Sequence, residues 1–344
     1  MELNINGLQV TPEAGETLRQ IVARLGLDSE KLSNRPLAAK IAGEVFTLNY
    51  VPKRNTDGEG ERPSVRRAMA ASNGVVNLLG YGDVLGKEAY IRTAQFVIFL
   101  AVRQLWPQAE AKVACTLGDS VYIRVSGAAD FSVDRLKSQV SSLVQEDIPL
   151  IRKRVSLQQA LEQFTQQGQQ DKSHLLAWRE FDYFDEYTYG DFADYFYGEM
   201  VPSTGYLTVW DIVEAEGGFV FVYPDDSCPD SLSKVPAMPN FFSVFTEGER
   251  WCELMECETV ADLNALVQSG RIRELIRVNE ALHEKRFSQV ADMVCGAGAK
   301  FVMLAGPSSS GKTTSANRLA TQLRVYGKKP ILMGLDDYYI ERDK

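Results

Sequence analysis

Apolar and polar residues recur along the first fifty positions in a pattern that predicts a small sheet with one helix. Residues 3–12 (LNINGLQVTP) alternate as a half-buried strand does. Residues 14–27 have a helical period, begin with a capping-box pattern and end at a glycine. Residues 37–52 predict two short strands around an Ala-Gly turn. The polar, charged and glycine-containing residues 52–74 then predict a linker.

The middle of the chain mixes helical and strand-like periods. Residues 89–108 predict a helix that ends near a proline, and residues 111–127 predict two strands about a Gly-Asp turn. Residues 132–169 predict two amphipathic helices, and residues 205–224 predict further strands. Residues 179–200 are acidic and aromatic together, and we expect the aromatic side chains to pack inward while the carboxylates stay solvated.

The last fifty residues show two compact apolar runs on either side of a glycine-rich loop. Residues 299–305 (AKFVMLA) and 329–335 (KPILMGL) each predict a buried parallel strand. Between them, GPSSSGKTT fits the pattern GxxxxGK[ST], and residues 313–327 predict the helix that follows it. A strand, this loop, a helix and a second strand form the context in which the pattern binds phosphate.

Each residue type in the loop has a physical task. Gly306 and Gly311 allow backbone angles that a side chain would forbid, so that the loop can wrap around a phosphate. Backbone N–H groups converge on the phosphate oxygens at the helix N-terminus, and Lys312 reaches the β- and γ-phosphates of ATP. The Thr313 hydroxyl is the expected ligand of Mg²⁺. The predicted nucleotide site comprises Gly306, Ser308, Ser309, Ser310, Gly311, Lys312, Thr313 and Thr314.

Two aspartates and two tyrosines follow the second apolar run. Because ligands of open parallel sheets lie beyond the carboxyl ends of the strands, Asp336 is expected near the loop. Its carboxylate could accept the proton of an attacking hydroxyl, or it could hold Mg²⁺ through water, and the first role is favoured. Asp337 is the next candidate. Tyr338 and Tyr339 either pack in the core or contact an acceptor nucleoside.

Composition narrows the class of protein. A length of 344 residues predicts two or three domains, and a net charge of -9 argues against a general binder of nucleic acid or membrane surfaces. No apolar run is long enough to cross a bilayer, and the five scattered cysteines are typical of free thiols in a reducing cytoplasm. We therefore expect a cytoplasmic protein. His174 and His283 are both expected on the surface.

Two known modules resemble the first 285 residues. The order of elements in residues 1–60 resembles a TGS domain, a ubiquitin-like β-grasp module of threonyl-tRNA synthetases and some GTPases. The segments RTAQFVIFLAVRQLWPQAE, GDFAD and VPSTG resemble the second additional domain of threonyl-tRNA synthetases, which hydrolyses mischarged tRNA in that family.

The hydrolytic residues of that second domain are replaced in this chain. Where the family has an HxxxH pair, this sequence has Arg92 and Phe96, and where the family has a Cys and a His, it has Phe196 and Met200. The replacements remove groups that could bind a metal, accept a proton or position water. The sequence thus predicts a filled cleft without editing hydrolysis.

The glycine-rich loop and the motif LDDYY resemble the uridine kinase and phosphoribulokinase group, in which the positions of Asp336 and Tyr339 serve as the base and as an aromatic contact to the nucleoside. The whole chain resembles a multidomain α+β and α/β protein with a TGS-like domain (1–62), a synthetase-like domain (63–285) and the first part of a kinase domain (286–344). The resemblance implies an enzyme that transfers the γ-phosphate of ATP to a nucleoside 5′-hydroxyl. Because two strands and one helix cannot bury a doubly wound core, we expect little turnover from these residues alone.

A second class of function stays open beside the kinase. The chain could be a nucleotide-responsive regulatory protein whose synthetase-like part contacts RNA or a partner without catalysis. The altered cleft of an otherwise retained domain favours this alternative, although the net charge does not support RNA contact.

Overall fold

The computed structural model describes residues 2–52, 74–235 and 239–338, and it divides into two compact units. The N-terminal unit is Met1–Thr246 and the C-terminal unit is Glu247–Lys344. The boundary predicted after residue 62 lies outside the described residues, as do residues 53–73 of the linker predicted at 52–74. The boundary predicted after residue 285 falls inside a continuous helix, α9 (Ile272–Gly296).

A five-stranded sheet with one helix forms the first part of the N-terminal unit. The strand order is β2-β1-β5-β3-β4. The strands are β1 (Leu3–Ile5), β2 (Leu8–Val10), β3 (Ala38–Ile41), β4 (Glu44–Thr47) and β5 (Val75–Leu79). Helix α1 (Leu18–Arg24) packs Leu18 and Ile21 against this sheet, and the short helix η1 (Leu32–Asn34) follows it. We call β1–β5 with α1 the five-stranded module.

The predicted helix and the predicted strand pair of residues 37–52 are confirmed, and one further strand completes the sheet. The strand predicted at residues 3–12 is instead a hairpin, β1 and β2, with a turn at Asn6 and Gly7. Thr17 and Gln20 form the reciprocal capping box of α1, and β3 and β4 pair antiparallel around the predicted turn. Strand β5 pairs parallel with β1 and antiparallel with β3, so it joins the two hairpins into one sheet. Its place in the centre depends on a pairing of residues some seventy positions apart, which local periodicity does not reveal.

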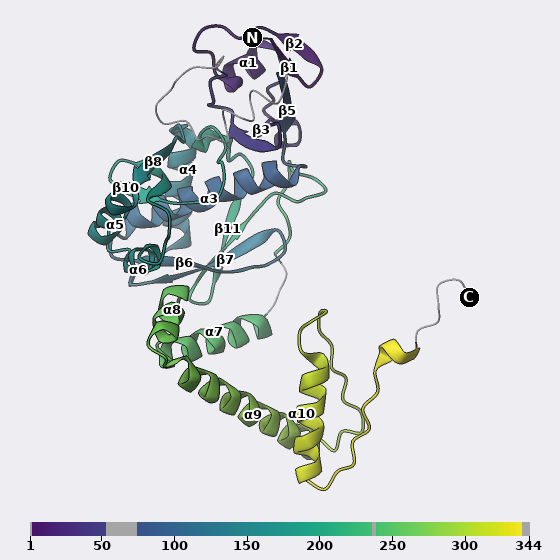
Figure 1. Ribbon diagram of the computed structural model, residues 1–344. Helices are drawn as coiled ribbons and strands as arrows, with labels where there is room; N and C mark the ends of the chain where they lie inside the picture. Colours follow the sequence, from purple (N-terminus) through teal and green to yellow (C-terminus); the bar gives the residue numbers. More distant parts are fainter. Residues whose placement is uncertain (1, 53–73, 236–238, 339–344) are drawn as a thin grey trace. The chain divides into compact units, whose positions relative to one another are not determined.

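The larger part of the N-terminal unit is built on a long helix and a four-stranded antiparallel sheet. Helix α3 (Val84–Leu105) lies between this sheet and the five-stranded module in Figure 1, with α4 (Val133–Gln145) beside it. The strand order is β11-β12-β7-β6, from β6 (Glu110–Thr116), β7 (Ser120–Ser126), β11 (Asp211–Ala215) and β12 (Gly218–Val222). One continuous core joins α3, α4 and this sheet to Leu37 and Ala38 of the module.

A three-stranded sheet lies next to this core, in the order β10-β9-β8. Its strands are β8 (Arg152–Ser156), β9 (Tyr183–Tyr189) and β10 (Phe192–Asp194). Helices α5 (Leu157–Gln166) and α6 (Gln170–Leu176) pack a small cluster around Phe164 against it, and η2 (Thr204–Tyr206) follows. The two predicted helices of residues 132–169 are confirmed as α4 and α5, whereas β8 between them was not predicted.

The C-terminal unit is mainly helical and exposes apolar residues. The helices are α7 (Pro239–Leu254), within which the division between the units falls, α8 (Val260–Gln268), α9, α10 (Lys312–Val325) and the short η3 (Leu335–Tyr338). Helices α9 and α10 pack against each other. No helix of the described residues is long and apolar enough to cross a membrane.

Candidate functional site

The four residues at the altered hydrolytic positions come together in the N-terminal unit. Arg92 and Phe96 lie one turn apart on α3, and Phe196 and Met200 follow β10. The ring centroids of Phe96 and Phe196 are 6.4 Å apart. The Nε of Arg92 donates a hydrogen bond to the carbonyl of Glu199, the neighbour of Met200, at 3.0 Å. The fold therefore places all four positions at a single site, which we call the α3 site.

The α3 site is packed with side chains. Phe96 is 0% exposed and Met200 is 1% exposed. Around Phe96, the ring centroids of Phe192 and Tyr187 lie at 5.5 Å and 6.4 Å. Aromatic rings at these separations and tilts are in ordinary packing contact. The predicted filling of this position is confirmed, and the residues at the four positions offer no thiol or imidazole.

The guanidinium of Arg92 contacts Glu88 and Gly198 at the α3 site. One terminal nitrogen of its guanidinium lies 3.2 Å from the Glu88 carboxylate, one turn earlier on α3. Gly198 faces the same guanidinium, and a Cβ at this position would lie 2.7 Å from the Arg92 Cζ. Gly198 has a φ of +130°, a conformation that other residues rarely adopt, so the backbone favours glycine here, whereas the guanidinium could move away from a Cβ. The arginine thus lies directly against the backbone.

A buried network of charges lies beneath these residues. Glu199 accepts a hydrogen bond from Arg152 at 3.0 Å, and the other terminal nitrogen of Arg152 donates to Asp185 at 2.8 Å. The hydroxyl of Tyr187 lies 3.4 Å from Glu199 and accepts a bond from the Met200 backbone N–H at 3.1 Å. Burial raises the pKa of Tyr187, and Glu199 raises it further, so the phenol stays neutral and bridges the network.

The expectation that carboxylates of residues 179–200 stay solvated was wrong for three of them. Glu186, Asp194 and Glu199 are all buried. Lys172 donates to Asp194 at 2.6 Å, and burial raises the pKa of Asp194 while Lys172 opposes that effect. Burial also raises the pKa of Glu186, which Lys153 partly offsets. Glu186 and Asp194 lie on β9 and β10, and β9 contributes Phe184 to one cluster and Tyr187 to another, which the local sequence does not show.

The described residues contain no group of His, Cys, Asp and Glu side chains that could hold a metal ion. His174 and His283 are exposed, as predicted, and the five cysteines are free. The α3 site therefore lacks the metal ligands and the imidazole base that a metal-dependent or base-catalysed hydrolysis requires.

The glycine-rich loop lies in the C-terminal unit at the start of α10. Gly311 precedes the helix with a φ of +80°, and Ser309 has a φ of +61°. The Nζ of Lys312 donates to the carbonyl of Pro307 at 2.6 Å, so the lysine folds back over the loop. Thr313 and Thr314 lie in the first turn of the helix. The predicted helix and the glycine before it are therefore confirmed.

The two buried strands predicted around this loop are wrong. Residues 301–307 and 328–334 are not in strands, and Phe301 is 88%, Met303 94% and Ile331 86% exposed. The reason is physical. A helix satisfies its backbone hydrogen bonds internally, whereas a strand needs a neighbour for its N–H and C=O groups. The described residues of this unit supply no such neighbour, so only the helix of the predicted strand–loop–helix–strand forms.

The residues predicted to act beside the loop are only partly described. Asp336 and Asp337 lie in η3, but their side chains are outside the described residues, as is Tyr339. Tyr338 is exposed, so it does not pack in a core. The proton-acceptor role of Asp336 therefore stays a prediction.

Comparison with known proteins relates the chain to one group of enzymes. No protein-family model matches it. The chain is 27% identical over 195 residues to the threonine--tRNA ligase of Desulforamulus reducens, which is 56% of this chain and 28% of that enzyme. It is 23% identical over 209 residues to the threonine--tRNA ligase of Symbiobacterium thermophilum, 60% of this chain and 29% of that enzyme. The chain thus spans less than a third of these relatives.

These relatives contradict the function predicted from the glycine-rich loop. They are named threonine--tRNA ligases and not kinases. The prediction of a nucleoside kinase of the uridine kinase type was therefore wrong, and with it the nucleoside substrate. A short loop pattern led to that reading, but the flanking strands that it requires do not form in the described chain.

Proposed function

We propose that the N-terminal unit is an RNA-binding module, related to threonine--tRNA ligases, that binds tRNA without hydrolysing it. The observation that carries the proposal is the similarity to those ligases combined with a packed α3 site. A domain that keeps its fold while its reactive groups are replaced retains shape and surface, which are the properties that binding uses.

The absence of hydrolysis follows from the α3 site. Hydrolysis of an ester requires a positioned water and a group that accepts its proton, or a metal that activates it. Phe96, Phe196 and Met200 supply neither, and Phe96 and Met200 are fully packed. The guanidinium of Arg92 donates hydrogen bonds and has no acceptor atom. Binding and hydrolysis are therefore separated in this chain.

A surface of aromatic and arginine side chains supports contact with unpaired bases. Trp178, Phe181 and Tyr197 are all exposed. The Arg179 Cζ lies 5.5 Å from the ring centroid of Phe181. Single-stranded RNA is bound largely by stacking on exposed aromatic rings and on guanidinium planes. We propose that this surface, which we call the aromatic surface, contacts an unpaired end or loop of a tRNA.

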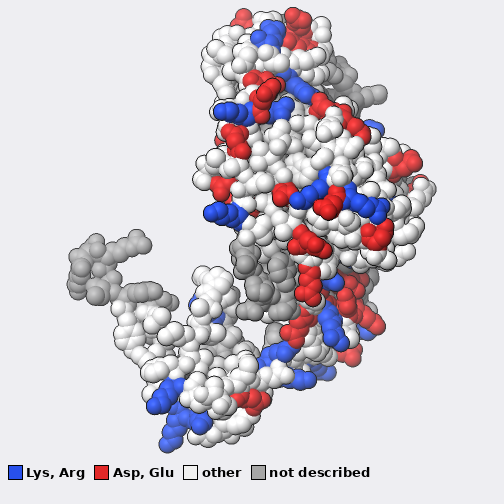
Figure 2. Space-filling view, turned by 180° about the vertical axis from the view of Figure 1, so that it is seen from behind, with Lys and Arg blue, Asp and Glu red and all other residues white. Residues whose placement is uncertain are grey.

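Charge sets how such binding depends on salt. The chain has a net charge of -9, and Figure 2 shows acidic and basic side chains interspersed over one face rather than gathered into a basic field. Only a few phosphates can then be neutralised. The slope of log affinity against log salt is expected to be no steeper than about -2, because each phosphate contact contributes somewhat less than one.

We propose in addition that binding responds to a nucleotide through the glycine-rich loop. Residues 306–314 carry the residue types that hold phosphates, with Lys312 and Thr313 at the start of α10. ATP with Mg²⁺ is the ligand proposed, as an effector and not as a phosphate donor. Lys312 would have to leave the carbonyl of Pro307 to reach a phosphate.

The test is tRNA binding by the full chain, measured as fluorescence anisotropy of a labelled threonine tRNA at several salt concentrations. Phe181→Ala should weaken binding on the order of tenfold, the loss expected for one stacked base. The matched control is Tyr326→Ala, which removes an exposed aromatic ring from the C-terminal unit. Misacylated threonine tRNA should lose its amino acid no faster in the presence of the chain than in buffer alone.

Two results would refute the proposal. If the chain binds tRNA no better than an unrelated acidic protein, or if both variants lose affinity equally, the aromatic surface is not an RNA site. If the chain deacylates misacylated tRNA above the buffer rate, and Phe96→Leu abolishes that activity, the α3 site is catalytic. Anisotropy with and without ATP and Mg²⁺ tests the nucleotide response separately.

A further inference from the structure

A small pocket opens in the N-terminal unit where the five-stranded module meets the segment after η2. It is lined by Asp28, Ser29 and Glu30, by Arg35 and, across from them, by Thr208. Its volume is about 260 Å³. The pocket belongs neither to the α3 site nor to the aromatic surface.

Arg35 is held in a fixed orientation at this pocket. Its side chain is only 15% exposed, and its Cζ lies 3.9 Å from the ring centroid of Tyr206, which is buried. One terminal nitrogen donates a long hydrogen bond of 3.5 Å to the carbonyl of Gly205. Stacking on an aromatic ring fixes the plane of a guanidinium and leaves its edges free to bind.

The hydrogen-bonding capacity of this guanidinium is not used up. A guanidinium has five N–H donors. In the part of the chain that the structure describes, the buried Nε has no hydrogen-bond partner, and the Asp28 carboxylate lies 3.7 Å from it, too far for a hydrogen bond. A fixed, incompletely bonded arginine at the wall of a pocket is the arrangement that binds a carboxylate or a phosphate.

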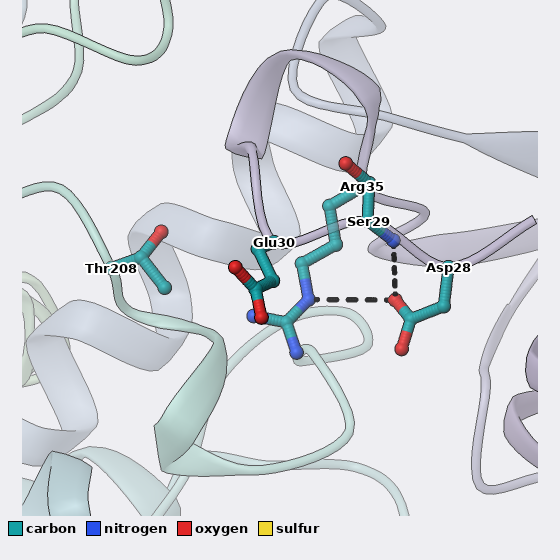
Figure 3. Close-up of a pocket in the computed structure, with 5 residues that line it drawn as sticks. All are labelled: Asp28, Ser29, Glu30, Arg35 and Thr208. Atoms are coloured by element: carbon teal, nitrogen blue, oxygen red, sulfur yellow. Dashed lines mark hydrogen bonds and ion pairs between the residues drawn. The ribbon is translucent and has the colours of Figure 1, made fainter.

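The other residues that line the pocket favour a ligand that carries both a negative and a positive charge. Figure 3 shows the side chains of Asp28 and Glu30 both pointing toward Arg35, so two carboxylates accompany one guanidinium. A phosphate would be repelled by the two carboxylates, and a simple amine would bring no anionic partner for the guanidinium of Arg35. A ligand that carries both charges matches the lining. The hydroxyls of Ser29 and Thr208 add neutral hydrogen-bonding groups.

We propose that this pocket binds a free α-amino acid. The ligand carboxylate binds the terminal N–H groups of Arg35, and its ammonium group lies by Glu30 and Asp28. The side chain of the ligand extends toward Thr208. The volume corresponds to that of about nine liquid waters, which is enough for a small amino acid.

A ligand bound in this pocket should stabilise the N-terminal unit, because the pocket lies between two parts of that unit. Arg35 belongs to the module, whereas Tyr206 and Gly205 belong to the larger part of the unit. A ligand bound to Arg35 and Thr208 therefore joins the two parts and should raise the unfolding temperature of the unit. This site is independent of RNA binding, so either proposal can fail without the other.

The experiment uses the full chain and the standard L-amino acids, each at roughly 10 mM, a concentration that detects millimolar Kd values. Binding is measured by ligand-observed NMR, and the Kd by calorimetry. For each amino acid that binds, the matched amine without a carboxylate and the matched acid without an ammonium group are tested. The amino acid should bind at least tenfold more tightly than either analogue, because each loses a charge-assisted bond.

Substitutions of the residues that line the pocket test whether the amino acid binds there. Glu30→Gln and Arg35→Lys should each raise the Kd on the order of tenfold. The matched control is Arg24→Lys on α1, whose partner is Glu16 and which lies outside the pocket. Because Glu30 is exposed, Glu30→Gln keeps the test valid if the Arg35 variant does not fold. Absence of binding by every amino acid, equal binding of an analogue, or an unchanged Kd in Glu30→Gln would each overturn the proposal.

Discussion

Replacing Phe96 with alanine tests whether the α3 site is packed core or a functional cleft. Phe96 is 0% exposed, and its ring meets the rings of Tyr187, Phe192 and Phe196. A buried phenylalanine removes about 150–250 Å² from water, which at about 25 cal/mol per Å² corresponds to roughly 4–6 kcal/mol, and the methyl group of alanine retains about 1 kcal/mol of this. That figure agrees with the range of about 3–5 kcal/mol measured for Phe→Ala changes in protein cores.

The matched control is the same change at an exposed phenylalanine. Phe181 is 59% exposed and lies in the same unit, so Phe181→Ala should lower stability by about 1 kcal/mol or less. Stability is read from hydrogen exchange of the slowest amides of α3, which report unfolding of this unit and not of the C-terminal helices. If Phe96→Ala prevents folding, Phe96→Leu provides a milder loss in the same direction.

The reasoning would be refuted by a small effect. If Phe96→Ala lowers the exchange free energy of α3 by less than about 1 kcal/mol, or no more than Phe181→Ala does, then Phe96 lines an open space. In that case the argument against hydrolysis at the α3 site would lose its structural basis. A loss near 4 kcal/mol would instead place Phe96 in the packed core of the N-terminal unit.

Three further predictions concern the hydrogen bonds of Asn49, the buried carboxylate of Glu186 and the glycine-rich loop. Asn49→Ala removes hydrogen bonds to the carbonyls of Pro202 at 2.7 Å and Leu150 at 3.3 Å, and should lower the free energy of unfolding by about 2 kcal/mol in urea denaturation. An unchanged urea midpoint would contradict this. Because burial raises the pKa of Glu186, the folded state keeps that proton to a higher pH than the unfolded chain, and the resulting stabilisation is lost as pH rises through the folded pKa. Glu186→Gln should therefore stabilise the protein more at pH 7.5 than at pH 4 relative to the parent chain, and equal differences at both pH values would exclude the effect. Lys312→Met should weaken ATP binding, measured by calorimetry, on the order of tenfold while helical content by circular dichroism stays the same; unchanged affinity would remove the lysine from the proposed nucleotide site.

The sequence predicted those elements whose signals are local. The capping box of Thr17 and Gln20 marks the start of α1, and the period of residues 89–108 marks α3, because a helix forms its hydrogen bonds between near neighbours. The two hairpins of residues 38–47 and 110–126 were readable for the same reason. The replaced hydrolytic residues were also visible from a resemblance of the local segments.

Only the tertiary structure decided which residues meet across the chain. Strand β5 joins its sheet through pairing with β1 and β3. Glu186 on β9, Asp194 on β10 and Glu199 after β10 are buried by contacts with other parts of the chain. The pocket at Arg35 exists because Tyr206, far along the chain, fixes the guanidinium. The apolar runs around the glycine-rich loop are a case in which local composition predicted elements that the structure does not form. Their composition indicates buried strands, but a strand forms only where a neighbouring strand satisfies its backbone, and hydrophobic residues are buried only where a second layer covers them.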